Sequence, residues 1–360
     1  MKKNADYFSY SRAPEIVRPL LDWYAGNARV LPWRDNPTPY RIWISEIMLQ
    51  QTRVDTVKPY FERFVKALPS IRHLAEAPED QLMKLWEGLG YYRRVQNLQK
   101  AARIILEKYQ GEFPADPEAI AELPGIGAYT TGSISSIAFG IPEPAVDGNV
   151  LRVLTRLAEC RTSLAEPRLK DAVADVLRKI YPSGKASEFT QSLMELGAMI
   201  CLPGAQAQCL LCPLNFCCGA CKSGTAEDFP VKEEKKIRGK ENMTVFLLRT
   251  QNGRLAIRKR AAAGLLAGLW ELPHVAGFLT EAEIQQLMKQ WDLNVLSLRK
   301  GRKTKHVFTH REWHMQPWEI QCIIPEKPET RLLWINYEDL VHEYALPTAF
   351  RKAFSCFPDS

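Results

Sequence analysis

The sequence has 360 residues, of which 46% are hydrophobic and 25% are charged. This composition excludes a disordered chain, and the length favours two domains over one. The first 20 residues lack the apolar core of a signal peptide, and the apolar run at 261–270 is too short to span a bilayer. We therefore expect a cytoplasmic protein with no membrane partner, and the net charge of +7 is a modest indication of a polyanion partner.

From about residue 10 to residue 222, apolar residues recur at the three- and four-residue spacing of amphipathic helices. The predicted helices cover 15–25, 40–53, 57–67, 78–85, 91–108, 117–122, 128–139, 150–158, 167–181 and 186–200. Glycine and proline lie in the turns between them. The pattern predicts an all-α domain over residues 1–224.

Glu46 lies within one of these helices, in YRIWISEIMLQQTRV. Three of the four residues that lie three and four positions away from it are apolar. A carboxyl group in such surroundings is partly desolvated, which raises its pKa and keeps a proton available. The alternative is a surface glutamate paired with Arg53.

Residues 123–132, LPGIGAYTTG, join two short helices in a hairpin at about 117–139. The glycines allow a tight turn with open backbone N–H groups at the start of the second helix, which is a ready phosphate site. Such a hairpin binds a DNA backbone through Gly125, Ile126 and Gly127 without reading its sequence. An ordinary turn between two helices is the alternative, and a Gly-x-Gly pattern alone favours it.

Asp147 and Asn149 lie in AVDGNVLRVL, just before another predicted helix. One of them is expected to be the N-cap of that helix, where a carboxylate is stabilised in its ionised form. Capping does not exclude chemistry. An apolar Glu46 and a helix-capping Asp147 would provide an acid and a stabilising anion, the divided roles used in bond cleavage at a sugar.

Six of the nine cysteines lie within residues 201–221. Gaps of seven, two and five residues separate Cys201, Cys209, Cys212 and Cys218. The clustering, the odd count and the expected cytoplasmic location argue against disulfides. Four thiolates suit either zinc or a [4Fe–4S] cluster, and the spacing leaves both open. Cys217 and Cys221 are rivals of Cys218 as fourth ligand, and ordinary buried cysteines are a further alternative.

Beyond the cysteines, residues 225–240 are predicted to form a charged linker. MTVFLLRT and RLAIRKR flank the turn signal Gln251-Asn252-Gly253, and HVFTH and WEIQCII are typical of further strands. Thr280 and Glu283 form a capping-box pattern that opens a helix. Residues 241–360 are therefore predicted to form a smaller α+β domain.

Together these parts resemble the helix–hairpin–helix DNA glycosylase superfamily with a terminal iron–sulfur loop. The resemblance is closest to the A/G-specific adenine DNA glycosylases of the MutY type, and it covers nearly the whole chain. Its motifs are LPWR (31–34), SEIMLQQT (45–52), GLGYYRR (88–94), LPGIGAYT (123–130), VDGNV (146–150), the cysteine loop and GLWELP (268–273). The family favours a [4Fe–4S] cluster over zinc, although the gap after Cys201 has seven residues where six is usual.

The resemblance also implies roles for the catalytic residues. Glu46 would protonate the departing adenine at N7 and then assist water attack, and Asp147 would stabilise the oxocarbenium-like sugar. Tyr129 and Asn149 would hold these two carboxyl groups in place. Relatives of the endonuclease III type carry a Schiff-base lysine at the position of Tyr129. The resemblance therefore implies a monofunctional glycosylase.

Further positions are implied to contact the substrate, which is double-stranded DNA containing adenine opposite 8-oxoguanine or guanine. Gln191 would read an edge of the flipped adenine, and Arg29, Leu31, Trp33 and Arg34 would line or support that pocket. Gln51 and Tyr91 would probe the stack beside the opposing base, with Tyr91 as the wedge.

The C-terminal domain resembles the Nudix-like lesion-recognition domain of this family. It lacks a Gly-x5-Glu-x7-Arg-Glu-x2-Glu-Glu box, so pyrophosphatase activity is not expected. Phe308, Thr309 and His310 correspond to a lesion-contacting Phe-Ser-His tip, with Thr309 replacing the serine.

Two other functions are consistent with parts of the sequence. One is a bifunctional glycosylase and lyase of the endonuclease III type, against which Tyr129 argues. The other is a non-enzymatic iron–sulfur DNA-binding protein, for which neither Glu46 nor Asp147 would be needed. For an adenine DNA glycosylase we expect a monomer.

Overall fold

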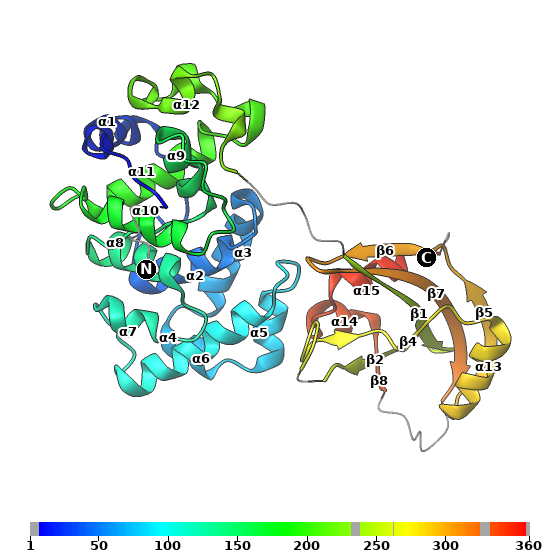
Figure 1. Cartoon of the computed structure of the whole chain (residues 1–360). Helices are drawn as coiled ribbons and strands as arrows, with labels where there is room; N and C mark the ends of the chain where they lie inside the picture. The colour runs from blue at the N-terminus through cyan, green and yellow to red at the C-terminus, as the bar shows by residue number, and fades with distance from the viewer. Residues whose placement is uncertain (1–6, 232–237, 262, 325–331, 358–360) are drawn as a thin grey trace. The chain divides into compact units, whose positions relative to one another are not determined.

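The computed structural model describes residues 7–231, 238–261, 263–324 and 332–357. Its contacts divide the chain into two compact units, Met1–Glu76 with Gln96–Glu234 and Ala77–Val95 with Lys235–Ser360 (Figure 1). Among the helices of the described residues, none is long and apolar enough to cross a membrane.

The N-terminal part of the chain is helical, as predicted (Figure 1). Its helices are α1 (Val17–Asn27), α2 (Pro39–Leu49), α3 (Val54–Ala67), α4 (Ile71–Glu76), α5 (Glu79–Leu85), α6 (Arg93–Lys108), α7 (Pro117–Ala121), α8 (Ala128–Phe139), α9 (Gly148–Leu157), α10 (Arg168–Arg178), α11 (Ala186–Met199) and α12 (Gly219–Lys222). Short 3₁₀ turns lie at Ala13–Ile16, Gly204–Gln206, Cys209–Leu211, Asn215–Cys217 and Ala226–Asp228.

Two helix predictions were inaccurate for identifiable reasons. The helix predicted over 40–53 ends at Leu49, because Gln51 has a φ of 59° that no α-helix accommodates. Helix α4 was not predicted, since its six residues are too few to show a helical period.

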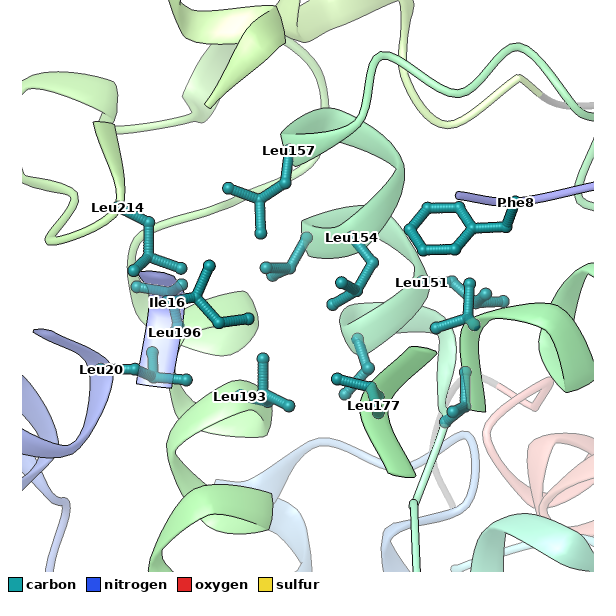
Figure 2. Close-up of a cluster of buried hydrophobic side chains, with 14 of the residues drawn as sticks. Phe8, Ile16, Leu20, Leu151, Leu154, Leu157, Leu177, Leu193, Leu196 and Leu214 are labelled. Carbon is teal, nitrogen blue, oxygen red and sulfur yellow. The ribbon is translucent and has the colours of Figure 1, made fainter. Parts of the chain in front are cut away.

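Apolar side chains from α1, α9, α10 and α11 form a buried core cluster in the first unit, to which the cysteine loop contributes Leu214 (Figure 2). Leu154 of α9 and Leu193 of α11 are almost completely buried there, and Leu214 anchors the cysteine loop to the same core. Phe229 is also buried, and its carbonyl oxygen accepts a hydrogen bond from Arg156 Nε at 3.1 Å. The first part of the predicted 225–240 linker therefore packs on the helical unit.

Glycine permits close backbone approach at two places that position the active-site helices. A Cβ atom at Gly132 of α8 would lie 2.1 Å from the carbonyl oxygen of Pro144, in the segment that leads to Asp147. A Cβ atom at Gly197 of α11 would lie 2.7 Å from Cβ of Asn149. Larger residues at these positions would push α8 and α11 away from the start of α9.

The second unit is built on a sheet of order β3-β2-β1-β7-β5, in which β4 also pairs with β1, β6 with β7 and β8 with β2. The strands are β1 (Gly239–Thr250), β2 (Leu255–Lys259), β3 (Trp270–Glu271), β4 (His274–Ala276), β5 (Asn294–Lys300), β6 (Thr304–Val307), β7 (Arg311–Ile323) and β8 (Leu333–Ile335). The helices that follow or separate them are α13 (Glu281–Gln290), α14 (Tyr337–His342) and α15 (Thr348–Phe354). The predicted α+β class is confirmed, as are the β1–β2 hairpin and the capping box of α13.

Alternate residues of β1 face the two apolar clusters of this unit. Val245 and Leu247 pack with α14 and α15, whereas Phe246 and Leu248 pack with α13. This two-residue period is expected of a sheet that is covered on both faces. A long parallel pairing of β1 with β7 forms the middle of the sheet.

The segment Ala77–Val95 groups with the second unit rather than with the helical residues on either side of it. Glu87 Oε1 accepts a hydrogen bond from the backbone N–H of Leu346 at 2.8 Å, and Lys84 Nζ donates to the carbonyl oxygen of Leu340 at 3.2 Å. These tertiary bonds join residues more than 250 positions apart. No local pattern in the sequence could have predicted this division.

Replacing Gly132 by alanine tests the close packing of α8. We expect Gly132→Ala to lower the free energy of unfolding by about 3 kcal/mol or more, because the added carbon meets backbone atoms rather than a movable side chain. Gly26→Ala in α1 is the control, where the added carbon meets nothing within 4 Å, and a gain of up to about 1 kcal/mol is expected. Urea unfolding followed by circular dichroism measures both, and equal midpoints would contradict the packing account.

Candidate active site

A cavity of about 1160 Å³ lies in the first unit, lined by α2, the start of α8, the start of α9, α11 and the segment before α2. It brings together eleven residues that were predicted to be catalytic, substrate-binding or backbone-binding. They are Arg29, Leu31, Trp33, Arg34, Glu46, Gln51, Gly127, Tyr129, Asp147, Asn149 and Gln191.

Glu46 projects from α2, which begins at a capping Thr38 followed by Pro39. Only 5% of Glu46 is exposed, and its Oε2 accepts a hydrogen bond from the Tyr129 hydroxyl at 2.5 Å. Burial raises the pKa of Glu46 to about 7, against the hydrogen bond from Tyr129. The alternative of a surface glutamate paired with Arg53 is therefore wrong.

Tyr129 remains a neutral hydrogen-bond donor in this arrangement. Burial of its hydroxyl group, and then the negative charge of Glu46, raise the pKa of Tyr129 well above its ordinary value. The tyrosine can orient the Glu46 carboxyl group but cannot act as an amine nucleophile.

Either Asp147 or Asn149 was predicted to cap this helix, and Asp147 is the N-cap of α9. Its Oδ1 accepts from the backbone N–H of Val150 at 2.7 Å, and its Oδ2 accepts from Asn149 Nδ2 at 2.8 Å. Burial raises the pKa of Asp147, and these two hydrogen bonds oppose the rise. The helix terminus therefore only partly offsets the desolvation of this carboxylate, contrary to the simple expectation from capping.

Arg152, which the sequence analysis did not identify, fixes the amide of Asn149. Its Nη2 donates to Asn149 Oδ1 at 2.9 Å, and its Nε donates to the carbonyl oxygen of Cys201 at 2.7 Å. Because arginine only donates, the oxygen of Asn149 must face it and the nitrogen must face Asp147. Arg152 lies three residues after Asn149, and this helical spacing is the sequence signal that could have indicated their contact.

The segment before α2 is held against α11. Arg29 and Arg34 both pair with Glu195 of α11, and Arg34 Nε donates to Gln191 Oε1 at 2.8 Å. Leu31 and Trp33 are buried beside the cavity. Glu195 was also missed, although it lies one helical turn after Gln191.

The hairpin between α7 and α8 has the tight glycine turn that was predicted. Gly125 has a φ of 80°, and a Cβ atom there would lie 2.7 Å from Cβ of Asn97. Ile126 is buried, whereas Gly127 caps α8 with nothing within 4 Å of the position a side chain would occupy. The space beside Gly127, at the start of α8, is thus free of other protein atoms.

The residues predicted to probe the opposing base lie at exposed, strained turns. Gln51 and Tyr91 have φ values of 59° and 48°, which side chains other than glycine rarely adopt. In the second unit, the Tyr91 hydroxyl lies 2.9 Å from the hydroxyl of Thr309, at hydrogen-bond distance. Phe308 packs on Trp313 with ring centroids 4.8 Å apart, and the neighbouring His310 is exposed.

The cysteine loop places four thiols within electrostatic range of one another. Burial, and after it the charges of Cys201, Cys218 and Cys209, raise the pKa of Cys212 to about 12. Four such neighbouring thiols would lose their protons on binding a cationic centre, whose charge would offset the repulsion between the thiolates. Within the described ranges, no three Cys, His, Asp or Glu side chains already have the arrangement of a metal-ion site.

Two rivals for the fourth cluster ligand differ in their surroundings. Cys217 is buried in the core and its Sγ donates to the carbonyl oxygen of Leu214 at 3.3 Å, so its thiol already has a partner there. Cys221 has its pKa raised by burial and then by the charge of Cys209. Cys218 interacts with Cys201 and Cys209 as well as with Cys221.

Comparisons with known proteins agree with this geometry. Residues 44–179 match the HhH-GPD superfamily of base excision DNA repair proteins, and residues 244–355 match the NUDIX domain. The chain is 32% identical to the adenine DNA glycosylase of Buchnera aphidicola subsp. Acyrthosiphon pisum, over 94% of this chain and 96% of that protein. It is 30% identical to the Homo sapiens adenine DNA glycosylase, over 94% of this chain and 73% of that protein.

A solved structure gives the same fold for the helical part. It is a trapped endonuclease III–DNA covalent intermediate, an estranged-adenine complex, with a TM-score of 0.51 and 26% identity over 62% of this chain and 99% of that chain. The curated relatives match at both domains and the cavity unites the predicted residues, so the chain belongs to the adenine DNA glycosylase family.

Proposed function

We propose that this chain removes adenine mispaired with 8-oxoguanine or guanine from double-stranded DNA, by hydrolysis of the N-glycosidic bond. One observation carries the proposal: a buried Glu46 with a raised pKa shares a cavity with Asp147, whose carboxylate is held by a helix N-terminus. The protein is expected to act as a monomer.

The two carboxyl groups suit different steps of this reaction. Glu46 retains a proton near neutral pH and can deliver it to N7 of a flipped adenine, which makes the base a better leaving group. Its carboxylate can then accept a proton from the attacking water. Asp147 accepts two hydrogen bonds that favour its ionised form, and its negative charge would stabilise the oxocarbenium-like sugar.

Hydrolysis without strand cutting follows from Tyr129. A lyase of the endonuclease III type needs a lysine amine there to form a Schiff base, and a phenol hydrogen-bonded to Glu46 provides none. Borohydride trapping of a stable covalent complex, with strand cutting at the rate of base removal, would require the bifunctional alternative instead.

DNA binding combines several surfaces of the chain. The Gly125–Gly127 turn would receive a backbone phosphate at the start of α8. Gln51 and Tyr91 would enter the stack, and Phe308, Thr309 and His310 would contact the 8-oxoguanine. Flipping adenine costs a few kcal/mol, and a mispair lowers this cost because its base stacks and pairs less well.

Cys201, Cys209, Cys212 and Cys218 would hold a [4Fe–4S] cluster in this chain. The cluster would act by folding the loop onto α9 and α11, because the thiolates that ligate it belong to the segment anchored by Leu214. No proton transfer in the proposed reaction passes through it.

Substitution of Glu46 tests the proposed acid. Glu46→Gln should lower single-turnover adenine excision by at least about 100-fold, because an amide has no proton to give. Glu15→Gln, at an exposed glutamate paired with Arg12, is the matched control and should excise normally. Normal excision by Glu46→Gln would remove Glu46 from the mechanism.

The raised pKa of Glu46 also predicts the pH dependence. The acid form dominates below about pH 7, so the single-turnover rate should be highest there and should fall by about tenfold per pH unit well above that value. A rate that rises from pH 6 to pH 8 would instead indicate that the reaction requires the carboxylate form of Glu46 in the enzyme–DNA complex.

The opposing base is tested with a panel of duplexes. Single-turnover excision of adenine should be fastest opposite 8-oxoguanine, slower opposite guanine and slowest opposite thymine, since the exposed Thr309 and His310 tip would read the lesion. Equal rates opposite 8-oxoguanine and thymine would refute lesion recognition while leaving adenine excision intact.

The cluster ligands are tested with three serine variants purified anaerobically. Cys218→Ser should lose most of its iron and sulfide. Cys217→Ser should retain both, because Cys217 is buried in the core and bonded to Leu214, and Cys221→Ser should also retain them. Iron and sulfide analysis with visible absorption gives the result, and zinc in the wild-type protein would overturn the cluster assignment.

A further inference from the structure

Glu195 is the most deeply buried charged group of the active-site cavity. Its side chain is 1% exposed, yet it accepts hydrogen bonds from the backbone N–H and the side-chain Nε of Arg29, at 2.9 and 2.8 Å. Its other oxygen accepts from Arg29 Nη2 at 2.9 Å and from Arg34 Nη2 at 3.0 Å. Burial alone would raise the pKa of Glu195, but the bonds from Arg29 and Arg34 lower it to about 2.

These bonds hold Arg34 in a single orientation. Besides its contacts with Glu195, Arg34 donates from Nη1 to the carbonyl oxygen of Arg29 at 2.8 Å, and its guanidinium lies 5.6 Å from the ring centre of Tyr24. The planar guanidinium is therefore fixed by several acceptors at once, as its fork of N–H groups allows.

Arg34 in turn determines which way the Gln191 amide points. Arg34 Nε donates to Gln191 Oε1 at 2.8 Å, and Gln191 Nε2 donates to Ser187 Oγ at 3.1 Å. Because arginine offers no acceptor, the amide oxygen must face Arg34. The amide then presents one acceptor lone pair and one N–H in a fixed order. The lone pair can accept from an exocyclic amine of a base, and the N–H can donate to the ring nitrogen beside that amine.

We infer that Glu195 is a positioning residue for adenine selectivity: it orients Arg34, and through Arg34 it fixes the Gln191 amide for the amine-bearing edge of adenine. This inference rests on the proposed function. Nothing in it requires Glu195 to touch the base.

Glu195 also affects the charge around Glu46. The titratable groups that act on Glu46 are Tyr129 of α8, Asp147 at the start of α9 and Arg34, whose positive charge lowers the pKa of Glu46. The carboxylate of Glu195 offsets that positive charge. Without it, the pKa of Glu46 should fall, and the alkaline limb of the rate profile should move to lower pH.

The test compares Glu195→Gln and Glu195→Asp in single-turnover excision from duplexes carrying adenine, or a purine without the N6 amine, opposite 8-oxoguanine. Glu195→Gln should excise adenine at least about 30-fold more slowly, because a displaced Gln191 amide would no longer hold the adenine in its reactive position. Its preference for adenine over the purine should fall towards one, and its alkaline limb should shift. Glu195→Asp keeps the charge and should lie between wild type and Glu195→Gln, with an unshifted limb.

Glu188→Gln is the matched control, since Glu188 is partly exposed on the same helix and pairs with Lys185. Wild-type rate, selectivity and pH profile in Glu195→Gln would overturn the inference, as would an equal loss on both bases with an unshifted limb. If Glu195→Gln does not fold, wild-type selectivity in a folded Glu195→Asp overturns it. Failure of the wild-type protein to remove adenine would instead refute the proposed function.

Discussion

The removal of the Glu46 carboxyl group from water is the constraint on which the helical unit depends. A carboxyl group buried on α2 needs a partner, and Tyr129 on α8 provides it. That pairing brings α2 against α8, and Gly132 lets α8 lie directly against the segment leading to Asp147. The geometry of the two carboxyl groups is therefore a result of how three pieces of chain pack.

The two active-site amides, Asn149 and Gln191, each have their orientation imposed by a donor-only arginine. Arg152 orients Asn149, which orients Asp147, and Arg34 orients Gln191. Arginine is suited to this task because it cannot reverse its role as a donor. An amide that could rotate freely would present either a donor or an acceptor to the same atom.

Much of this was predictable from the sequence, and the failures have common physical causes. Helical periodicity located α8 and α11, and the position of Asp147 ahead of an apolar period indicated an N-cap. Glu195 could not be found in this way, because its burial depends on arginines about 160 positions away. Likewise, the burial of Cys217 could not be predicted from spacing, since the core that receives it is assembled from distant helices.

The positive φ angles of Gln51 and Tyr91 have a consequence for how DNA is surveyed. Each angle costs about 1–3 kcal/mol, and the surrounding fold holds it in place. The backbone entropy of these two turns is thus already lost when the chain folds. If the two side chains contact the duplex as proposed, binding would demand no further ordering of the backbone at either turn, and each encounter with a base pair could be brief.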